Sequence, residues 1–380
     1  MKLFNIVATT TIGLESCVKI ELKNLGIENV RVENGYLEYE GTAETVIKSN
    51  IYLRCADRVY VKMGEFKAFT FDELFEGTKA IMWEELLPVT ANFPISWVSS
   101  VKSKLLSKSD CQRIVKKAIV ERLRNVYKVD EIPETHSKYA IKVQLEKDLA
   151  TILIDTSGEA LHKRGYRKKH LEAPLKETLA AGMIMLSSWR GDRFNFIDPM
   201  CGTGTIPIEA AMIAKNIAPG ANRKFISEEW CSLKKELWLK VRDEAFSGEK
   251  ESIIIKIFGS DSDKKAIEIA KENAIEAGVE ECIIFEVKNF TELEKSDERN
   301  VIVTNPPYGE RLMQDVEVEA LYYQLGKCLK ANHPESSWHI ITSYEAFESA
   351  FSKKAEKNRK LYNGGLRCYL YHYQNSKKKL

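Results

Sequence analysis

The chain contains 380 residues, of which 44% are hydrophobic and 29% are charged, and its formal net charge at pH 7 is +2. This length and composition are typical of a soluble globular protein with two or three domains. They argue against a membrane-spanning protein, because the longest apolar runs are far shorter than the roughly 18 residues that a membrane helix requires. The near-neutral charge does not by itself indicate a nucleic-acid partner.

The N-terminus and the cysteines both favour a cytoplasmic protein. Polar residues at 9–11 and Glu15 come too early for a secretory signal peptide. The eight cysteines are scattered, without a C-x-x-C pair or a neighbouring histidine cluster. We therefore expect reduced thiols and no metal site.

Residues 1–65 are predicted to form a ferredoxin-like domain. The pattern is strand, helix, strand, strand, helix, strand, and Asn34–Gly35 is a typical hairpin turn. The expected elements are Phe4–Thr10, Ser16–Leu25, Val30–Val32, Tyr36–Tyr39, Thr42–Asn50 and Val59–Met63. No residue here indicates chemistry, so we expect a packing or spacing module.

Residues 66–156 are predicted to form a second α+β domain. The expected elements are a helix Phe71–Leu87, a strand Ile95–Ser99, a helix from Ser109 to about Tyr127, and strands Ala140–Leu145 and Ala150–Asp155. Ser109 and Gln112 have the spacing of a capping box at the start of the longer helix.

The longer helix and the segment before it are rich in positive charge. Residues 102–128 contain nine lysines and arginines against Asp110 and Glu121. One helix face is apolar, with Val115, Ile119, Leu123 and Val126, and another is basic. The candidate RNA-backbone contacts are Lys104, Arg113, Lys117 and Arg124. An ordinary solvated basic face is the alternative.

Residues 157–175 read as a basic linker. Gly165 and Tyr166 lie among basic residues, and Pro174 is a typical first residue of a helix. The candidate RNA contacts in this linker are Lys163, Arg164, Arg167 and Lys168. A solvated connection without function is the alternative.

Residues 176–380 alternate between helix and strand, which predicts an α/β domain with a mostly parallel, doubly wound sheet. The expected helices are Lys176–Trp189, Ile206–Lys215, Lys264–Ala277, Glu319–Leu329 and Phe347–Lys353. The expected strands are Phe194–Ile197, Ile253–Phe258, Ile283–Val287, Val301–Thr304 and Trp338–Thr342, followed by a hairpin over 360–373. Residues 216–250 look like an insertion of unknown role.

Three of these strands end in residues suited to a nucleoside ligand with a positive end. The first precedes the glycine-rich string Asp198-Pro199-Met200-Cys201-Gly202-Thr203-Gly204-Thr205, which is neither a dinucleotide fingerprint nor a P-loop. Asp261, which ends the second, can bind two ribose hydroxyls. Asn289 and Phe290, after the third, suit the edge and the face of an adenine. Ligands bind at this edge of open α/β sheets.

The fourth strand ends in a stiff corner, Asn305-Pro306-Pro307-Tyr308. Two prolines stop the strand and restrict the residue before them. The Asn305 side-chain oxygen and the Pro306 carbonyl can accept both hydrogens of a ring amine, and Tyr308 can stack on the ring. A strand-end turn with a packing tyrosine is the alternative.

Together these motifs resemble class I S-adenosylmethionine-dependent methyltransferases that act on amino groups. With the preceding half, the chain resembles THUMP-domain RNA methyltransferases, and in particular the guanine-N2 half of the bacterial large-subunit rRNA enzyme RlmL. The resemblance rests on the Asp198–Thr205 string, residues 162–167 and the string Asn305–Arg311. It departs at Asn289, where relatives commonly carry Asp. The chain also lacks the guanine-N7 half found fused in some relatives, so that activity is expected to be absent.

The resemblance implies methyl transfer to the N2 amine of a guanine in RNA, with 23S rRNA or a large-subunit assembly intermediate as the partner. It implies that Asn305, Pro306, Pro307 and Tyr308 are catalytic. It also implies cofactor binding by Asp198, Pro199, Cys201, Gly202, Gly204, Thr205, Asp261, Asn289, Phe290 and Asn305. The alternatives are a tRNA guanine or DNA adenine methyltransferase, and an RNA-binding assembly factor whose cofactor site has decayed. A dehydrogenase is disfavoured because the glycine fingerprint is missing.

Overall fold

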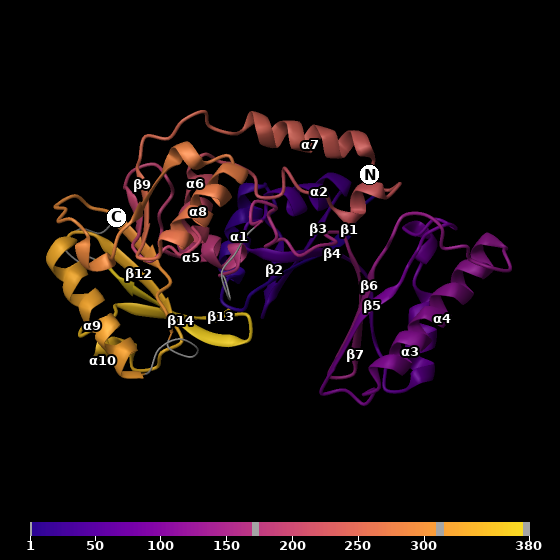
Figure 1. Cartoon of the computed structure of the whole chain (residues 1–380). Coiled ribbons are helices and arrows are strands. Elements are labelled where there is room, and N and C mark those ends of the chain that lie inside the picture. The colour runs from indigo at the N-terminus through magenta and orange to yellow at the C-terminus, as the bar shows by residue number, and fades with distance from the viewer. Residues whose placement is uncertain (1, 169–174, 309–314, 375–380) are drawn as a thin grey trace.

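The computed structural model describes residues 2–168, 175–308 and 315–374 (Figure 1). The expected helix start at Pro174 and the end of the string, Gly309–Arg311, lie outside these residues. The chain forms two seven-stranded sheets, one in each half. Within the described residues, no helix is both long and apolar enough to cross a bilayer.

The first half contains a ferredoxin-like unit followed by the second predicted α+β unit, which we call the THUMP unit after the domain it resembles. The ferredoxin-like elements are β1 (Phe4–Thr10), α1 (Glu15–Asn24), β2 (Val30–Glu33), β3 (Tyr36–Gly41), α2 (Ala43–Tyr52) and β4 (Ala56–Lys67). The THUMP elements are α3 (Phe71–Ala80), the 3₁₀ turn η1 (Trp83–Glu85), β5 (Ile95–Val101), α4 (Lys108–Tyr127), β6 (Ile141–Glu146) and β7 (Leu149–Asp155). The predicted order of elements is confirmed in both units.

Strand β4 belongs to both units. Its twelve residues pair with β1 on one side and with β7 on the other, so the first sheet has the order β2-β3-β1-β4-β7-β6-β5. The predicted boundary between residues 65 and 66 therefore falls inside a strand. The two units share one sheet through this strand, whereas the sequence pattern predicted two separate domains.

Two helix predictions in the THUMP unit are wrong in detail. The helix predicted over Phe71–Leu87 ends at Ala80, and η1 follows it. The N-cap of α4 is Ser107, whose Oγ accepts from the Asp110 N–H at 3.3 Å, and not Ser109. The side chain of Gln112 donates to the Ile95 carbonyl at 2.8 Å instead of closing a capping box, because β5 lies within its reach.

The second half is the predicted α/β domain. Its helices are α5 (Glu177–Leu186), α6 (Thr205–Ala214), α7 (Lys235–Ser247), α8 (Lys264–Glu276), α9 (Asp315–Asn332) and α10 (Phe347–Ala350). Its strands are β8 (Phe196–Asp198), β9 (Ile257–Asp261), β10 (Ile283–Val287), β11 (Val301–Thr304), β12 (Ser337–Thr342), β13 (Lys357–Asn363) and β14 (Leu366–Tyr373). Short 3₁₀ turns are η2 (Ile226–Glu229), η3 (Glu280–Cys282) and η4 (Phe290–Glu292).

The second sheet has the order β10-β9-β8-β11-β12-β14-β13. The first five strands pair in parallel, and β14 pairs antiparallel with both β12 and β13, so β14 alone runs against the other six. The prediction of a mostly parallel sheet is confirmed. The strand predicted from Ile253 starts four residues later, at Ile257, and Ile254 is 98% exposed. The run of isoleucines has strand propensity, but its first part has no partner strand.

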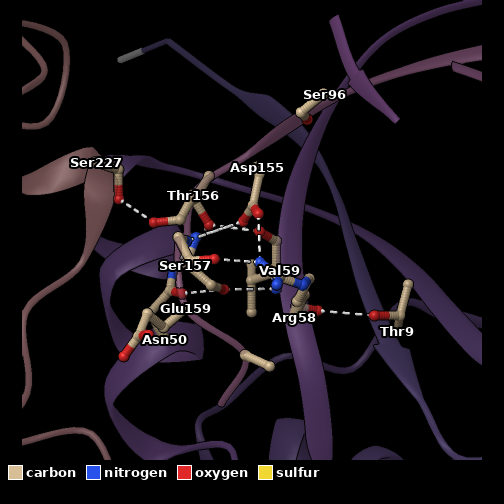
Figure 2. A network of polar contacts seen from close by, with 12 residues as sticks. Thr9, Asn50, Arg58, Val59, Ser96, Asp155, Thr156, Ser157, Glu159 and Ser227 are labelled. Carbon is tan, nitrogen blue, oxygen red and sulfur yellow. Dashed lines mark hydrogen bonds and ion pairs between the residues drawn. The ribbon is translucent and has the colours of Figure 1, made fainter. Parts of the chain in front are cut away.

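The ferredoxin-like unit packs directly on the C-terminal domain, and Figure 1 shows it between that domain and the THUMP unit. One continuous apolar core includes Val18 of α1 and Met183 of α5. Polar contacts fix the point where β7 ends. Ser157 Oγ donates to Asn50 Oδ1 of α2 at 2.7 Å and accepts from the Val59 N–H of β4 at 2.9 Å (Figure 2).

Candidate active site

The predicted site residues of the C-terminal domain follow four neighbouring strands. β10, β9, β8 and β11 are adjacent and parallel, so their carboxyl ends share one edge of the sheet. The chain order reverses between β8 and β11, and such a switch point forms a crevice where ligands bind. Asp198 and Asn305 therefore follow the two strands that flank this switch point.

Asp198 is a buried carboxylate with an unused oxygen. Asp198 is the last residue of β8, and 1% of its surface is exposed. Its Oδ1 accepts from the Met200 N–H at 3.2 Å. Oδ2 is buried without a hydrogen bond from any described residue. Burial raises the pKa of Asp198 to about 7, while the neighbouring Thr304 hydroxyl and the Met200 N–H lower it by less. A cationic ligand group would satisfy Oδ2 and favour the ionised form.

The loop after Asp198 is held open by two glycines and by the next strand. Gly202 and Gly204 have positive φ values of 52° and 84°. A Cβ on Gly202 would meet no atom within 4 Å, so the loop borders free space there. The Gly202 N–H donates to Asp261 Oδ2 at 2.9 Å. This contact brings the ends of β8 and β9 together, and a carboxylate keeps further lone pairs for hydroxyl groups.

The remaining loop residues already contact other parts of the chain. Pro199 and Cys201 are buried, and the Cys201 N–H donates to the Ser260 carbonyl at 2.9 Å. Burial raises the pKa of the Cys201 thiol well above its ordinary value, so it stays protonated. Thr205 begins α6, and its hydroxyl accepts from Arg167 at 2.7 Å.

The third strand end fits the adenine prediction less well. Asn289 Oδ1 caps η4, since it accepts from the Thr291 N–H at 3.0 Å and from the Thr291 hydroxyl at 2.8 Å. Phe290 is 7% exposed and belongs to a core cluster with Ile302 and Leu325. Its burial argues against an adenine-facing ring. In the sequence, Phe290 is simply a hydrophobic residue at the start of a short turn, and that pattern does not distinguish a core side chain from a ligand contact.

The Asn305–Tyr308 corner is held from two sides. The Tyr308 hydroxyl donates to Asn305 Oδ1, the same oxygen that was predicted to accept a substrate amine. Burial raises the pKa of Tyr308 well above its ordinary value, so its hydroxyl keeps its proton and is a poor general base. Pro306 is buried and Pro307 exposed.

Sequence reasoning missed the support under this corner. The Tyr322 hydroxyl of α9 donates to the Pro307 carbonyl at 2.8 Å and lies 2.8 Å from Thr342 Oγ1 of β12. Tyr322 is fully buried. A tyrosine on an otherwise apolar helix face was the available signal, because a buried hydroxyl needs a partner.

Two of the linker's described residues, Arg164 and Tyr166, are buried against the C-terminal domain. Arg164 is 5% exposed, lies 3.4 Å from Glu209 of α6, and donates to the Leu161 carbonyl at 2.7 Å and to the Arg54 carbonyl. The prediction that Arg164 binds RNA is therefore wrong, since its guanidinium is already enclosed. Tyr166 is also buried and donates to Glu209 at 3.2 Å. A glutamate inside the apolar helix 205–214 was the overlooked signal.

The other predicted RNA contacts differ in how free they are. Arg167 is largely buried against Thr205 and Glu177. Lys163 and Lys168 are exposed but pair with Glu159 at 2.9 Å and Glu276 at 2.5 Å. The four residues of the THUMP unit, Lys104, Arg113, Lys117 and Arg124, are all exposed.

The charge surplus of α4 is smaller than the sequence suggests. Arg113 pairs with Asp110, while Lys116 and Arg122 pair with Glu134 and Glu84 from other segments. Val126, placed on the apolar face by periodicity, is 38% exposed. The basic face that remains includes Lys117 and Arg124.

Comparison with known proteins identifies the family. The RMKL-like methyltransferase domain model matches residues 164–372, the RlmL ferredoxin-like domain model residues 5–60, and the THUMP domain model residues 68–155. The chain belongs to the RlmL-like family of S-adenosylmethionine-dependent RNA methyltransferases.

Two relatives illustrate this membership. The protein named "Putative RNA methyltransferase YpsC" of Bacillus subtilis (strain 168) is 47% identical over 380 residues, covering 98% of this chain and 96% of the relative. The ribosomal RNA large subunit methyltransferase K/L of Psychromonas ingrahamii is 37% identical over 379 residues, covering 97% of this chain. The matched region is 50% of that longer protein.

Solved structures give the same fold and the cofactor. The crystal structure described as "SMU.472, a putative methyltransferase complexed with SAH" is 43% identical, has a TM-score of 0.94, and is matched over 100% of both chains. A Listeria monocytogenes protein named as a predicted N6-adenine-specific DNA methylase is 47% identical with a TM-score of 0.93, over 99% of this chain and 97% of that one. S-adenosylmethionine is therefore the cofactor of this RlmL-like chain.

The described site fits that cofactor. The unused oxygen of Asp198 suits the ammonium of the methionyl part, the open space at Gly202 admits a ligand against the loop, and Asp261 can accept from ribose hydroxyls.

Proposed function

We propose that this RlmL-like protein methylates the exocyclic N2 amine of a guanine in RNA, and that the RNA is 23S rRNA or a large-subunit assembly intermediate in the cytoplasm. The observation that carries the proposal is the parallel pairing of β8 with β11, because Asn305 and the loop after Asp198 then follow neighbouring strands at one edge of the sheet. The named function of the K/L relative supports the rRNA substrate.

In this proposal Asn305 and Pro306 orient the amine. The N2 lone pair of guanine is delocalised into the ring, so the free base is a weak nucleophile. Hydrogen bonds from both amine hydrogens to Asn305 Oδ1 and the Pro306 carbonyl aim the nitrogen and stabilise its developing positive charge. Holding the two reactants in line contributes up to roughly 7–11 kcal/mol in favourable intramolecular models.

The cofactor supplies a methyl group on a sulfonium, which is already activated as a leaving group. The new C–N bond forms as the S–C bond breaks, and the amine then loses one proton. Because the Tyr308 pKa is raised, that side chain does not take the proton, and we assign the proton to water. Asp198, Gly202, Gly204 and Asp261 hold the cofactor, and no metal takes part.

Tyr308 has a second part in this scheme. A guanine that enters the site must be unstacked from its helix, and stacking on an aromatic ring returns about 1–3 kcal/mol. Asn305 Oδ1 already accepts from the Tyr308 hydroxyl, and an amide oxygen has a second lone pair for the substrate amine.

The test of substrate is a comparison of modified nucleosides in cells with and without this protein. Loss of one N2-methylguanosine from 23S rRNA is the expected result. An unchanged rRNA with a change in tRNA would replace the proposed substrate with tRNA. No change in either RNA, with no binding of S-adenosylmethionine, would leave an RNA-binding assembly factor.

The test of the site is Asn305→Ala. We expect turnover to fall by at least roughly 100-fold, as when one charge-stabilising group is removed from an active site. Titration calorimetry should still detect cofactor binding, because Asp198 and Asp261 are untouched. Leu239→Ala, on the exposed side of α7, is the matched control. Normal turnover by Asn305→Ala would exclude the proposed role.

A further inference from the structure

The segment 216–250, which we call the bridging segment, is connected at both ends to cofactor-binding elements. It leaves α6, whose first residue Thr205 follows the glycine loop, and it leads to β9, which ends at Asp261. It contains η2 and α7, and Figure 1 shows α7 extending from the C-terminal domain over α2. Its two ends are therefore anchored in the C-terminal domain.

The bridging segment packs closely on the ferredoxin-like unit. The Gly220 N–H donates to the Ile51 carbonyl of α2 at 2.8 Å, and a Cβ on Gly220 would lie 2.6 Å from the Asn50 carbonyl oxygen. Any larger residue at 220 would push the segment away from α2. Two ion pairs extend this contact along α7: Lys240 with Glu44 at 3.1 Å, and Lys48 with Glu244 at 3.2 Å.

The same segment contacts the THUMP unit through one aromatic anchor. Trp230 is 2% exposed and stacks on Tyr139, with ring centroids 4.5 Å apart and an interplanar angle of 17°. Trp230 Nε1 donates to the Lys138 carbonyl at 2.9 Å. Ser137 Oγ donates to the Glu229 carbonyl at 2.7 Å. The anchor therefore has both an apolar and a directional component.

A further contact lies where β7 leaves the THUMP unit. Ser227 Oγ donates to the Thr156 carbonyl at 2.7 Å, and the Thr156 hydroxyl donates to the Val59 carbonyl of β4 at 2.7 Å (Figure 2). The bridging segment thus holds the THUMP unit at two places, the end of β7 and the loop before β6. Two separated contacts restrict rotation as well as translation.

We propose that the bridging segment, with Trp230 as a positioning residue, fixes the THUMP unit relative to Asn305 and so determines which nucleotide of the bound RNA is methylated. The proposal rests on the proposed function, since it takes RNA to be held by the THUMP unit. A rigid spacing selects one nucleotide because a misplacement of about 1 Å can cost roughly 100-fold in rate.

The experiment compares Trp230→Ala, Trp230→Phe and the Leu239→Ala control with the wild type. The substrate is 23S rRNA from cells that lack the protein, incubated with radiolabelled S-adenosylmethionine, and the methylated positions are mapped. We expect Trp230→Ala to lose at least tenfold in rate at the wild-type position and to gain secondary positions. Trp230→Phe, which keeps a ring, should restore the wild-type pattern.

Two readouts separate positioning from stability and from the chemistry. Affinity for S-adenosylhomocysteine should stay at the wild-type value, and small-angle scattering should show a larger radius of gyration for Trp230→Ala only. If Trp230→Ala does not fold, Tyr139→Leu removes the same stack from the THUMP side.

An unchanged position pattern together with unchanged scattering would overturn the inference. A wild-type protein that methylates no RNA would instead overturn the proposed function, and scattering would then still report whether Trp230 holds the THUMP unit.

Discussion

At the scale of single residues, the corner Asn305–Tyr308 was identifiable from the sequence because its geometry is local. Two prolines after a run of β-branched residues dictate a stiff strand end wherever they occur. Their surroundings were not predictable. That Tyr308 donates to Asn305 Oδ1, and that Tyr322 supports Pro307 from below, depends on α9 and β12, which are distant in sequence.

Two substitutions of Tyr308 separate its ring from its hydroxyl. Tyr308→Ala removes the stacking surface and should lower kcat/KM for RNA by roughly 5- to 150-fold, the equivalent of about 1–3 kcal/mol. Tyr308→Phe keeps the ring and removes only the hydroxyl that donates to Asn305 Oδ1, so it should keep roughly the wild-type kcat. Steady-state methylation kinetics measure both. A Phe variant as impaired as the Ala variant would show that the hydroxyl itself takes part in turnover.

The raised pKa of Asp198 predicts a pH dependence of cofactor binding. Burial favours the protonated carboxyl group and raises the pKa of Asp198 to about 7. The ammonium group of the ligand binds the ionised carboxylate. Affinity for S-adenosylhomocysteine should therefore rise as pH increases towards 7, and fall by up to about tenfold per unit below it. Calorimetry between about pH 5.5 and 7.5 measures this. Asp198→Asn should bind weakly with a flat profile, and a flat wild-type profile would contradict the assignment.

At the scale of elements, the alternation of helices and strands was predictable, but partners and ends were not. The run Ile253–Phe258 has strand propensity throughout, yet only Ile257 onward pairs with β8 and β10. Ser109 has the spacing of a cap, yet Ser107 caps α4. In both cases a local rule allowed several starts, and contacts from other segments selected one.

The buried pair of Arg164 and Glu209 ties the linker to α6, and its loss should be costly. Their side chains are 2% and 0% exposed. Glu209→Ala leaves a buried guanidinium without its carboxylate, and we expect the free energy of unfolding to fall by about 3–5 kcal/mol. The double variant Arg164→Met, Glu209→Leu should lose less, because it removes the buried guanidinium together with the carboxylate it pairs with.

Urea unfolding of these variants measures the effect, with Lys163→Ala as the control, since its partner Glu159 is exposed and surface pairs contribute little. Equal losses for the single and double variants would mean that hydrogen bonds from Arg164 to the Leu161 and Arg54 carbonyls dominate, and not the pair. An exposed, RNA-contacting Arg164 would predict no loss in either case.

At the scale of the whole molecule, the sequence indicated the kinds of domain and their order, but not how they are joined. Continuity of the first sheet through β4, and the contacts of residues 216–250 with both N-terminal units, connect segments far apart in the chain. The count of positive charges on α4 overestimated its basic face, because it also ignored contacts from distant segments. Lys116 and Arg122 contribute to the apparent surplus of α4, but acidic residues from elsewhere neutralise them.

This correction yields a prediction about RNA binding by the whole chain. Lys117 and Arg124 are exposed, and no ion pair is formed by either among the described residues. Each phosphate contact contributes about 0.7–0.9 to the slope of log affinity against log salt. Lys117→Ala with Arg124→Ala should therefore weaken binding to 23S rRNA fragments and flatten that slope by about 1–2. Arg122→Ala, which removes a residue paired with Glu84, should leave the slope unchanged. Fluorescence anisotropy between about 50 and 200 mM salt measures both, and an equal effect of the two variants would place the RNA on another face.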